Sequence, residues 1–236
     1  MTSIIITTLA SLIAVFFVLI PHEFAHAFVA YKNGDPTAKM YGRLTLNPIK
    51  HIDPVGFILC IFTGFGWAKP VPIYPYNFRK YRVGLFTTAI AGVVTNYVIA
   101  FIAYPLYLLF YSILLPITET EIAHYTVQFI GSIFYLIYFY SLTVFVFNIL
   151  PLNPLDGFRV VESITREINP VRRFLRNCGQ YILIFLVVEC FICNQIVERT
   201  SLYYFSYFNI LGYYLEWFAK IIGFPIKALW DLIFGL

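Results

Sequence analysis

Charged residues are scarce in this sequence, and their scarcity excludes a soluble protein. Only 12% of its 236 residues are Asp, Glu, Lys or Arg, and 60% are hydrophobic, whereas soluble domains contain about 25% charged and about 45 to 50% apolar residues. The charges also cluster, which leaves long uncharged stretches that a water-exposed surface does not tolerate. We therefore predict a multi-pass protein of the cell membrane, surrounded by the lipid bilayer.

Cysteine is scarce as well, which excludes a disulfide framework. All the cysteines stand in apolar surroundings, where a free thiol packs as a small hydrophobic side chain; they are Cys60, Cys178, Cys190 and Cys193. The last two form a C-x-x-C pair, but a second pair or nearby histidines are missing, so the pair is poor evidence for metal or redox chemistry. We interpret all four as packing residues.

The sequence also lacks the features of a cleaved leader and of a nucleic-acid-binding protein. The opening apolar run has no basic n-region and no small-residue cleavage site, so we expect it to be retained as a membrane span. The formal net charge of +4 comes from basic residues beside the apolar segments, as in proteins that are oriented by cytoplasmic Lys and Arg. We expect no nucleic-acid partner.

Five apolar segments are long enough to cross ~30 Å of hydrocarbon, which takes about 20 helical residues. They cover residues 3–31, 83–115, 125–150, 178–196 and 201–218. The tail over 220–236 is interrupted by Gly, Pro and charged residues and fits an interfacial helix. We predict an all-α bundle of about five transmembrane helices in one domain over 1–236, with a core over 1–160 and accessory helices over 161–236.

The connections between these segments predict the orientation of the chain. The connection over 32–82 carries eight Lys and Arg against two Asp, the next carries Glu119 and Glu121 with no basic residue, and the third is basic again. Because cytoplasmic loops are enriched in Lys and Arg, we expect the N-terminus outside and the basic connections in the cytoplasm.

The first basic connection is itself partly apolar. Residues 40–46 alternate as a strand does, and residues 55–68 are apolar and rich in glycine but too short to span. Irregular backbone exposed to lipid would leave its amides unpaired, so we predict a small membrane-associated segment here, either β or re-entrant. The prolines at 70, 72 and 75 favour an extended exit.

The first apolar segment ends in His22-Glu23-Phe24-Ala25-His26, an H-E-x-x-H pattern. Residues four apart share a helix face, so both imidazoles can reach one ion, and Glu23 is placed to take a proton from bound water. The alternative is a chance match with ordinary core histidines. However, ionisable groups so close together in a membrane helix are expensive and are functional candidates by default.

Catalytic zinc takes three protein ligands and keeps one open position, so a third ligand is needed. The realistic candidates are His51, His124, Asp156 and Glu162. His124 belongs to the connection assigned to the outside, and Glu162 is expected to face water. His51 is on the correct side, but no helix fixes its depth. Asp156 follows the third span at the depth of His26, although without the H-E-x-x-H an ordinary Asp-Gly turn at a helix end would explain it better.

These residues resemble the site-2 protease family of intramembrane zinc metalloproteases. The resemblance extends from the first span to about residue 160. Besides the H-E-x-x-H it rests on 42–48 (GRLTLNP), 66–72 (GWAKPVP), Ala91-Gly92 with Asn96, and 148–151 (NILP) leading into Leu155-Asp156-Gly157. The resemblance implies one zinc ion held by His22, His26 and Asp156, with Glu23 as the catalytic glutamate. It also implies a substrate that is a transmembrane or membrane-proximal segment of another protein.

Two asparagines are candidates for substrate binding. Thr88, Gly92 and Asn96 recur every four residues and form a small, polar stripe, which should face protein. The resemblance favours an Asn96 that hydrogen-bonds the backbone of an unwound substrate, and helix packing is the alternative. Asn148 could orient the active site or satisfy carbonyls freed by Pro151.

Some residues depart from the family pattern or from the apolar pattern. Val93 and Asn153 stand where many members of the family have proline, which concerns substrate handling more than chemistry. Glu189 interrupts an apolar span, and we expect it to reach the outer interface rather than to act in the site.

Other functions also fit parts of this pattern. A non-catalytic zinc protein is the main alternative, but a structural zinc site closes its fourth position and has no use for an adjacent Glu23. A transporter fits less well, because no inverted repeat with paired broken helices is visible. We therefore predict a zinc-dependent membrane endopeptidase.

Overall fold

The computed structural model describes residues 2–63, 66–200 and 203–236. Long helices dominate it: α1 (Thr2–Asn33), α5 (Tyr81–Leu108), α6 (Glu121–Ile149), α8 (Pro170–Thr200) and α9 (Ile210–Phe234). Short α-helices join them: α2 (Thr37–Met40), α3 (Pro48–His51), α4 (Pro54–Thr63) and α7 (Asp156–Ile164). The remaining helical turns are η1 (Pro75–Asn77), η2 (Leu109–Leu114), η3 (Leu115–Ile117) and η4 (Tyr203–Phe208).

The predicted helical membrane architecture is confirmed, although the predicted number of spans is not. Among the described residues, four helical segments are long and apolar enough to cross a membrane: Ile6–Asn33, Tyr81–Ile117, Glu121–Ile149 and Pro170–Val197. The fifth predicted span, over 201–218, does not form one continuous helix. Instead η4 ends before Asn209, whose side chain accepts the N–H of Gly212 at 2.8 Å and starts α9 as a new helix.

The predicted strand over 40–46 is wrong, because α2 and a turn occupy this segment. Gly42, which follows the end of α2 at Met40, has a φ of +64°, a left-handed conformation that does not occur in a regular strand. No β-strand occurs in the described part of the chain, where Ile52 and Ala68 form only an isolated antiparallel bridge. The apolar run after this turn begins as the helix α4, and residues 64–65 of that run lie outside the description.

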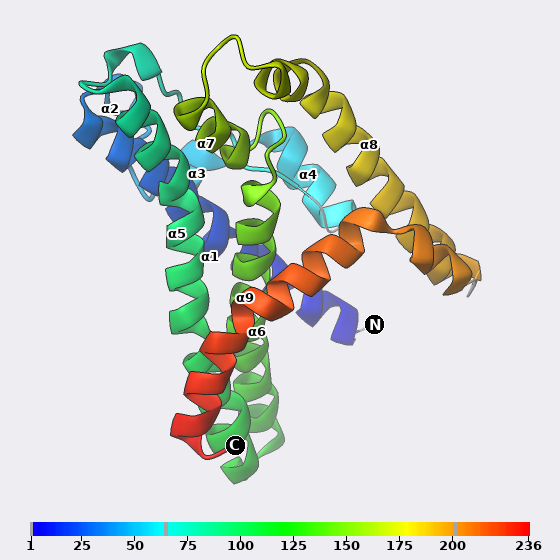
Figure 1. Ribbon diagram of the computed structural model, residues 1–236. Helices are drawn as coiled ribbons and strands as arrows, with labels where there is room; N and C mark the ends of the chain where they lie inside the picture. The colour runs from blue at the N-terminus through cyan, green and yellow to red at the C-terminus, as the bar shows by residue number, and fades with distance from the viewer. Residues whose placement is uncertain (1, 64–65, 201–202) are drawn as a thin grey trace.

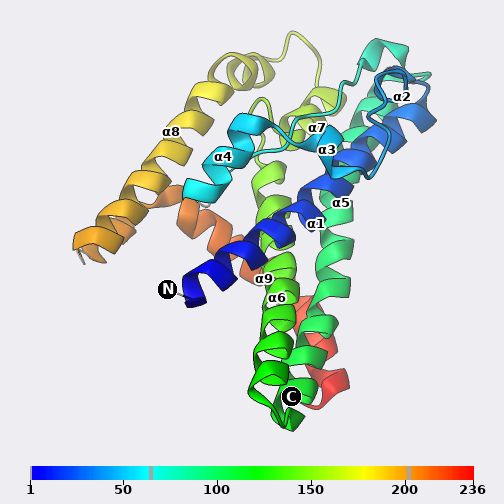
Figure 2. The same ribbon diagram turned by 180° about the vertical axis from the view of Figure 1, so that it is seen from behind.

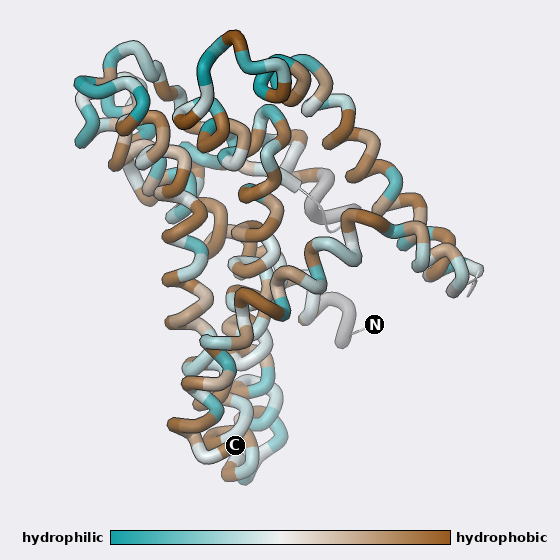
Figure 3. The backbone as a smooth tube through the Cα atoms, in the orientation of Figure 1, coloured by the Kyte–Doolittle hydropathy of each residue, from teal (hydrophilic) through white to brown (hydrophobic). Residues whose placement is uncertain are grey.

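The core is built by α1, α5 and α6, which pack against one another, with α9 against α5 and α6 (Figure 1). Small residues allow this close approach, since Ala14 on α1 and Ala100 on α5 are fully buried. The short helix α4 lies against α1 (Figure 2). Hydrophilic residues gather at the end of the bundle formed by α2 and the connection between α7 and α8 (Figure 3).

Asp35 holds the connection between α1 and α5 in place at this polar end. Its carboxylate is fully buried and accepts the N–H groups of Thr37 and Tyr74, at 3.1 and 2.7 Å, and the side-chain amide of Asn77 at 2.8 Å. Burial alone would raise the pKa of Asp35, but these hydrogen bonds outweigh burial and lower it. One carboxylate thus joins both ends of the connection.

Glu189 lies where α8 meets α9. It is half-buried, and its Oε1 accepts the N–H of Ile210, the first residue of α9, at 3.2 Å. A carboxylate at a helix N-terminus is favourable because it satisfies a free N–H and meets the positive end of the helix dipole. Glu189 therefore joins α8 to α9.

Candidate metal centre

His22 and His26 lie one turn apart on α1 and are both buried, with 4% and 5% of their surface exposed. Their Nε2 atoms are 3.0 Å apart. Two imidazoles that present nitrogen atoms to one point are the arrangement predicted from the H-E-x-x-H spacing.

Asp156 approaches these histidines from a different part of the chain. It is the first residue of α7, and its Oδ2 lies 3.3 Å from Nε2 of His22 and 3.0 Å from Nε2 of His26. The glycine after it makes this possible, because a Cβ on Gly157 would lie 2.6 Å from the carbonyl carbon of Ile149 and closer still to two carbonyl oxygens. The chain therefore needs Gly157 to turn from α6 into α7.

The three converging atoms fit a zinc ion. A tetrahedral zinc with bonds of about 2.0 to 2.1 Å separates its ligand atoms by about 3.3 Å, and the three distances given above are 3.0, 3.0 and 3.3 Å. Oδ2 of Asp156 is buried and has no hydrogen-bond donor of good geometry among the described residues. Two imidazoles and a carboxylate are a donor set that zinc prefers, so this buried group could hold a metal ion.

Charge also suits a cation at this point. Burial disfavours the ionised form of Asp156, but the neighbouring His26 and His22 outweigh burial and hold the pKa of its carboxyl below the usual value. The site therefore presents a carboxylate rather than a carboxylic acid.

The helix α5 contacts the far sides of both imidazoles. Nδ1 of His26 lies 2.7 Å from the carbonyl oxygen of Thr88, and the side-chain amide of Asn96 lies 3.1 Å from Nδ1 of His22. Between them, a Cβ on Gly92 would lie 2.6 Å from Cε1 and 2.7 Å from Nε2 of His22, and closer to His26. The stripe of Thr88, Gly92 and Asn96 thus faces protein, as predicted, and it faces the two histidines.

Glu23 is half-buried next to His22 and is held by a distant segment. Its Oε2 accepts the backbone N–H of Val71 at 2.9 Å. Val71 packs on Ala27 and Ala38, and the segment before it is fixed by Arg43, whose guanidinium donates to the carbonyl of Lys69 at 2.7 Å. Sequence analysis missed this contact, although Val71 carries the one N–H between the two prolines of GWAKPVP.

The other candidates for a third ligand are engaged elsewhere. Nε2 of His51 lies 2.7 Å from the carbonyl of Thr45, and His124 lies at the start of α6, at the opposite end of the bundle (Figure 1). Glu162 accepts hydrogen bonds from two arginines, Arg172 at 3.2 Å and Arg176 at 2.6 Å. Of the four candidates, the structure brings Asp156 to the histidines.

The two asparagines predicted to bind substrate have different surroundings. Asn96 is fully buried against His22. Asn148 is half-buried near the end of α6 and donates to the carbonyl of Val144, one turn earlier, at 3.0 Å. Of the two asparagines, Asn148 has exposed surface that a substrate could contact.

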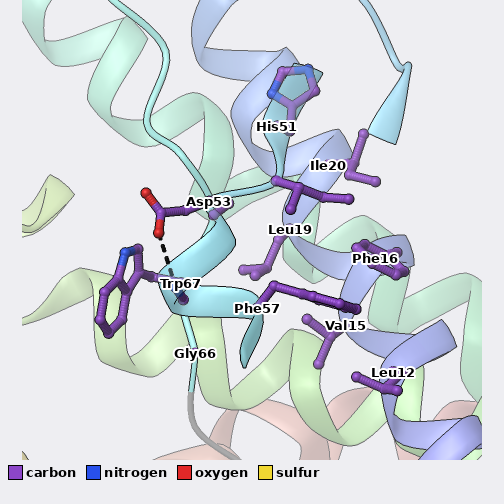
Figure 4. A pocket seen from close by; sticks show the side chains of 13 residues that line it. Leu12, Val15, Phe16, Leu19, Ile20, His51, Asp53, Phe57, Gly66 and Trp67 are labelled. Carbon is purple, nitrogen blue, oxygen red and sulfur yellow. Dashed lines mark hydrogen bonds between the residues drawn. The ribbon is translucent and has the colours of Figure 1, made fainter. Parts of the chain in front are cut away.

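A small apolar cavity of about 30 Å³ lies between α1 and α4, away from the metal-binding group (Figure 4). The side chains of Phe16, Leu19 and Phe57 line it, together with Trp67. His22, His26 and Asp156 are not among its lining residues. This cavity is therefore separate from the residues that could hold a metal ion.

Comparison with known proteins identifies relatives over most of the chain. It is 42% identical over 168 residues to the "Putative zinc metalloprotease YwhC" of Bacillus subtilis, covering 71% of this chain and 74% of that protein. It is 28% identical over 171 residues to the "Putative zinc metalloprotease Rip2" of Mycobacterium tuberculosis, covering 71% of this chain and 61% of that protein, which is less than two thirds of it. The Rip2 protein of Mycolicibacterium smegmatis is 27% identical over 203 residues, which cover 82% of this chain and 71% of that protein.

No solved structure gave a significant match. The family model described as Peptidase family M50 matches residues 10–190, a range that includes the H-E-x-x-H pattern, Asp156 and the supporting stripe on α5. The chain therefore belongs to peptidase family M50, the site-2 protease family, as its sequence motifs indicate.

Proposed function

We propose that this protein is a membrane zinc metalloendopeptidase that cleaves a peptide bond within or next to a transmembrane segment of another membrane protein. The observation that carries the proposal is the buried convergence of His22, His26 and Asp156 beside Glu23. Membership of a peptidase family and the zinc metalloprotease names of the relatives support both the protease activity and the metal.

In this proposal, His22, His26 and Asp156 hold one zinc ion and leave one position open. The bound ion would supply Lewis acidity, which polarises the scissile carbonyl and acidifies water. Glu23 accepts the proton of the attacking water and delivers it to the leaving amine. Its other carboxylate oxygen stays on the N–H of Val71, so the reacting oxygen keeps a fixed direction.

The substrate must present an unwound peptide bond, because a hydrogen-bonded helix hides its carbonyl groups. We place the unwound strand beside the non-helical segment over 67–74. This segment lies next to the proposed base, because its Val71 donates an N–H to Glu23. Asn148 is the asparagine that we retain as a substrate contact. Asn148→Ala is expected to raise KM with zinc affinity unchanged, and a loss of zinc affinity would contradict this role.

We further propose a single domain over 1–236 with its N-terminus outside and its metal centre near the cytoplasmic face. The support is that α2 and the connection between α7 and α8, which belong to the two basic connections, lie at the same end of the bundle as α7 (Figure 1). In this arrangement α4 is a re-entrant or interfacial helix. A cysteine introduced at Glu119 should react with an impermeant thiol reagent on intact cells. A cysteine at this position that does not react would indicate the opposite orientation.

A non-catalytic zinc protein is the second candidate. A structural site closes its coordination with a fourth protein ligand, whereas three converging groups are found in the described part of the chain. The position of Glu23, bound through one oxygen to Val71, also favours a hydrolase.

Reconstituted protein and a model transmembrane substrate would test the proposed reaction. Chelation should abolish cleavage, and added zinc should restore it. Glu23→Gln should lower kcat by about 100-fold or more, because general base catalysis contributes about 10²- to 10⁴-fold, and the variant should still bind zinc. The matched control is Glu167→Gln, which changes an exposed acid and should keep normal activity. Full activity in Glu23→Gln would show that Glu23 is not the base.

A further inference from the structure

We infer that Asn96 is a positioning residue for the metal centre: when zinc is bound, the side-chain carbonyl of Asn96 accepts the Nδ1–H of His22. This bond keeps the Nε2 lone pair of His22 directed at the ion. The inference rests on the proposed ligand set, and it replaces the substrate-binding role that the sequence suggested for Asn96.

The first argument is the position of the amide. Asn96 is fully buried on α5, and its side chain lies against Nδ1 of His22, 3.1 Å from the amide nitrogen. As placed, the amide nitrogen faces the ring, and Oδ1 is buried without a hydrogen-bond partner in the described residues. The two ends of an amide have nearly the same shape, so a half-turn of the group exchanges them.

The second argument is the tautomer that metal binding requires. A neutral imidazole has one N–H, and the nitrogen that binds a metal must be the other one. If Nε2 of His22 binds zinc, Nδ1 carries the proton and needs an acceptor. Within hydrogen-bond distance of this Nδ1, the structure provides the amide of Asn96. Its carbonyl oxygen supplies that acceptor after the half-turn.

The tautomer of His26 is set in the same way, by a backbone carbonyl. Its Nδ1 lies 2.7 Å from the backbone carbonyl of Thr88, which can only accept a hydrogen bond. His26 is therefore fixed in the tautomer with a free Nε2. The amide of Asn96 can serve either tautomer of His22, as a donor without metal and as an acceptor with metal. With its carbonyl oxygen toward Nδ1, Asn96 fixes His22 in the same tautomer as His26.

The burial of Asn96 argues against direct contact with substrate. None of the surface of Asn96 is exposed, so a substrate backbone does not reach the amide without a rearrangement of the side chains around it. We therefore assign Asn96 to His22.

Zinc affinity, measured by competition with a chromophoric chelator, tests this inference without an activity assay. Asn96→Leu should weaken zinc binding by about 10- to 100-fold, the usual effect of removing a hydrogen-bond partner of a metal-bound histidine. Asn96→Asp should stay within about 3-fold of the wild-type Kd, because its carboxylate provides the same acceptor. Thr95→Val is the control on the neighbouring position, whose side chain points about 100° away around the helix.

An Asn96→Leu variant that binds zinc as tightly as wild type would overturn the inference, as would an Asn96→Asp variant that binds 10-fold or more weakly. If Asn96→Leu does not fold, Asn96→Asp decides alone by the same limits. His22→Ala distinguishes the two levels of the account. If zinc affinity is unchanged in His22→Ala, the proposed ligand set fails, whereas a loss in His22→Ala with no change in Asn96→Leu refutes only the role of Asn96.

Discussion

At the scale of single residues, the proposed base Glu23 is held by a backbone group far away in the sequence. Val71 donates its N–H to Oε2 of Glu23 at 2.9 Å, and a hydrogen bond to a charged group contributes about 1.5 to 3 kcal/mol. The glutamate is thus oriented by a segment that contributes none of the proposed metal ligands.

Val71→Pro removes this one donor. We expect kcat to fall by about 10- to 100-fold, with KM and zinc content little changed, because the bond stabilises the orientation of the base. Val71→Ala keeps the N–H and should retain kcat within about 3-fold, although it loses packing against Ala27. Steady-state cleavage of the model substrate measures both. Equal losses in the two variants would attribute the effect to packing instead.

Asp35 gives the fold a predicted dependence on pH. Its pKa is lower in the folded protein than in the unfolded chain, so the folded state binds fewer protons in the acid range. The stabilisation is present above the ordinary value of about 4 and is lost as the pH falls through the lower folded value.

Asp35→Asn should therefore destabilise the protein by about 2 kcal/mol at pH 7, since it places an amide among four hydrogen-bond donors, the N–H and hydroxyl of Thr37, the N–H of Tyr74 and the amide of Asn77. The difference in melting temperature from wild type, measured in detergent, should narrow below about pH 4. A difference that stays constant from pH 7 to pH 3 would exclude an ionised Asp35 as its cause.

Much of the site at this scale was predictable because its determinants are local. The i, i+4 spacing places His22 and His26 on one helix face, and the depth of Asp156 follows from its place just after a span. The partners Val71 and Thr88 were not predictable, since they act through backbone groups that only the tertiary fold brings near. The fully buried position of Asn96 against His22 has the same cause, and it changes the role that we assign to this residue.

At the scale of elements, α5 supports the candidate metal centre without contributing any of the proposed ligands. Thr88 and Asn96 contact the imidazoles from either side of Gly92, whose missing Cβ leaves space for both rings. This close approach explains why the stripe on α5 is small as well as polar.

Gly92→Ala should therefore displace the histidines. A Cβ at this position would lie 2.6 Å from Cε1 of His22, and a misplacement of about 1 Å costs about 100-fold in rate. Zinc binding should weaken in parallel. The control is Gly131→Ala on α6, where a Cβ would meet its nearest neighbour, Phe110, at 3.3 Å. Chelator competition and cleavage compare the two variants, and a Gly92→Ala protein with normal zinc affinity would contradict the close packing.

The long helices were predictable from apolar length alone, whereas the short elements and α9 were not. Polar and apolar residues alternate over 40–46 as they do in a strand, but the positive φ of Gly42 produces a turn there. The fifth apolar segment is divided at Asn209, because the side chain of Asn209 accepts the N–H of Gly212 and caps a new helix there. Local capping and positive φ values thus decide boundaries that hydropathy does not detect.

At the scale of the whole molecule, the bundle brings two distant parts of the chain together at one polar end. α1 carries the histidines and α7 carries the aspartate, and both pack around α5. Helices long and apolar enough to cross a membrane, together with a buried group that could hold a metal ion, fit the proposed peptidase of membrane proteins. The family match over residues 10–190 covers this arrangement and most of α8.

The zinc content per chain tests the central claim most directly. Elemental analysis of protein purified in detergent should give about one zinc per chain in wild type, the stoichiometry of a single catalytic site. Glu23→Gln should also retain about one, because we assign Glu23 as the base and not as a ligand. Asp156→Ala should retain far less than one. An Asp156→Ala protein that still holds a full equivalent of zinc would contradict the proposed metal centre.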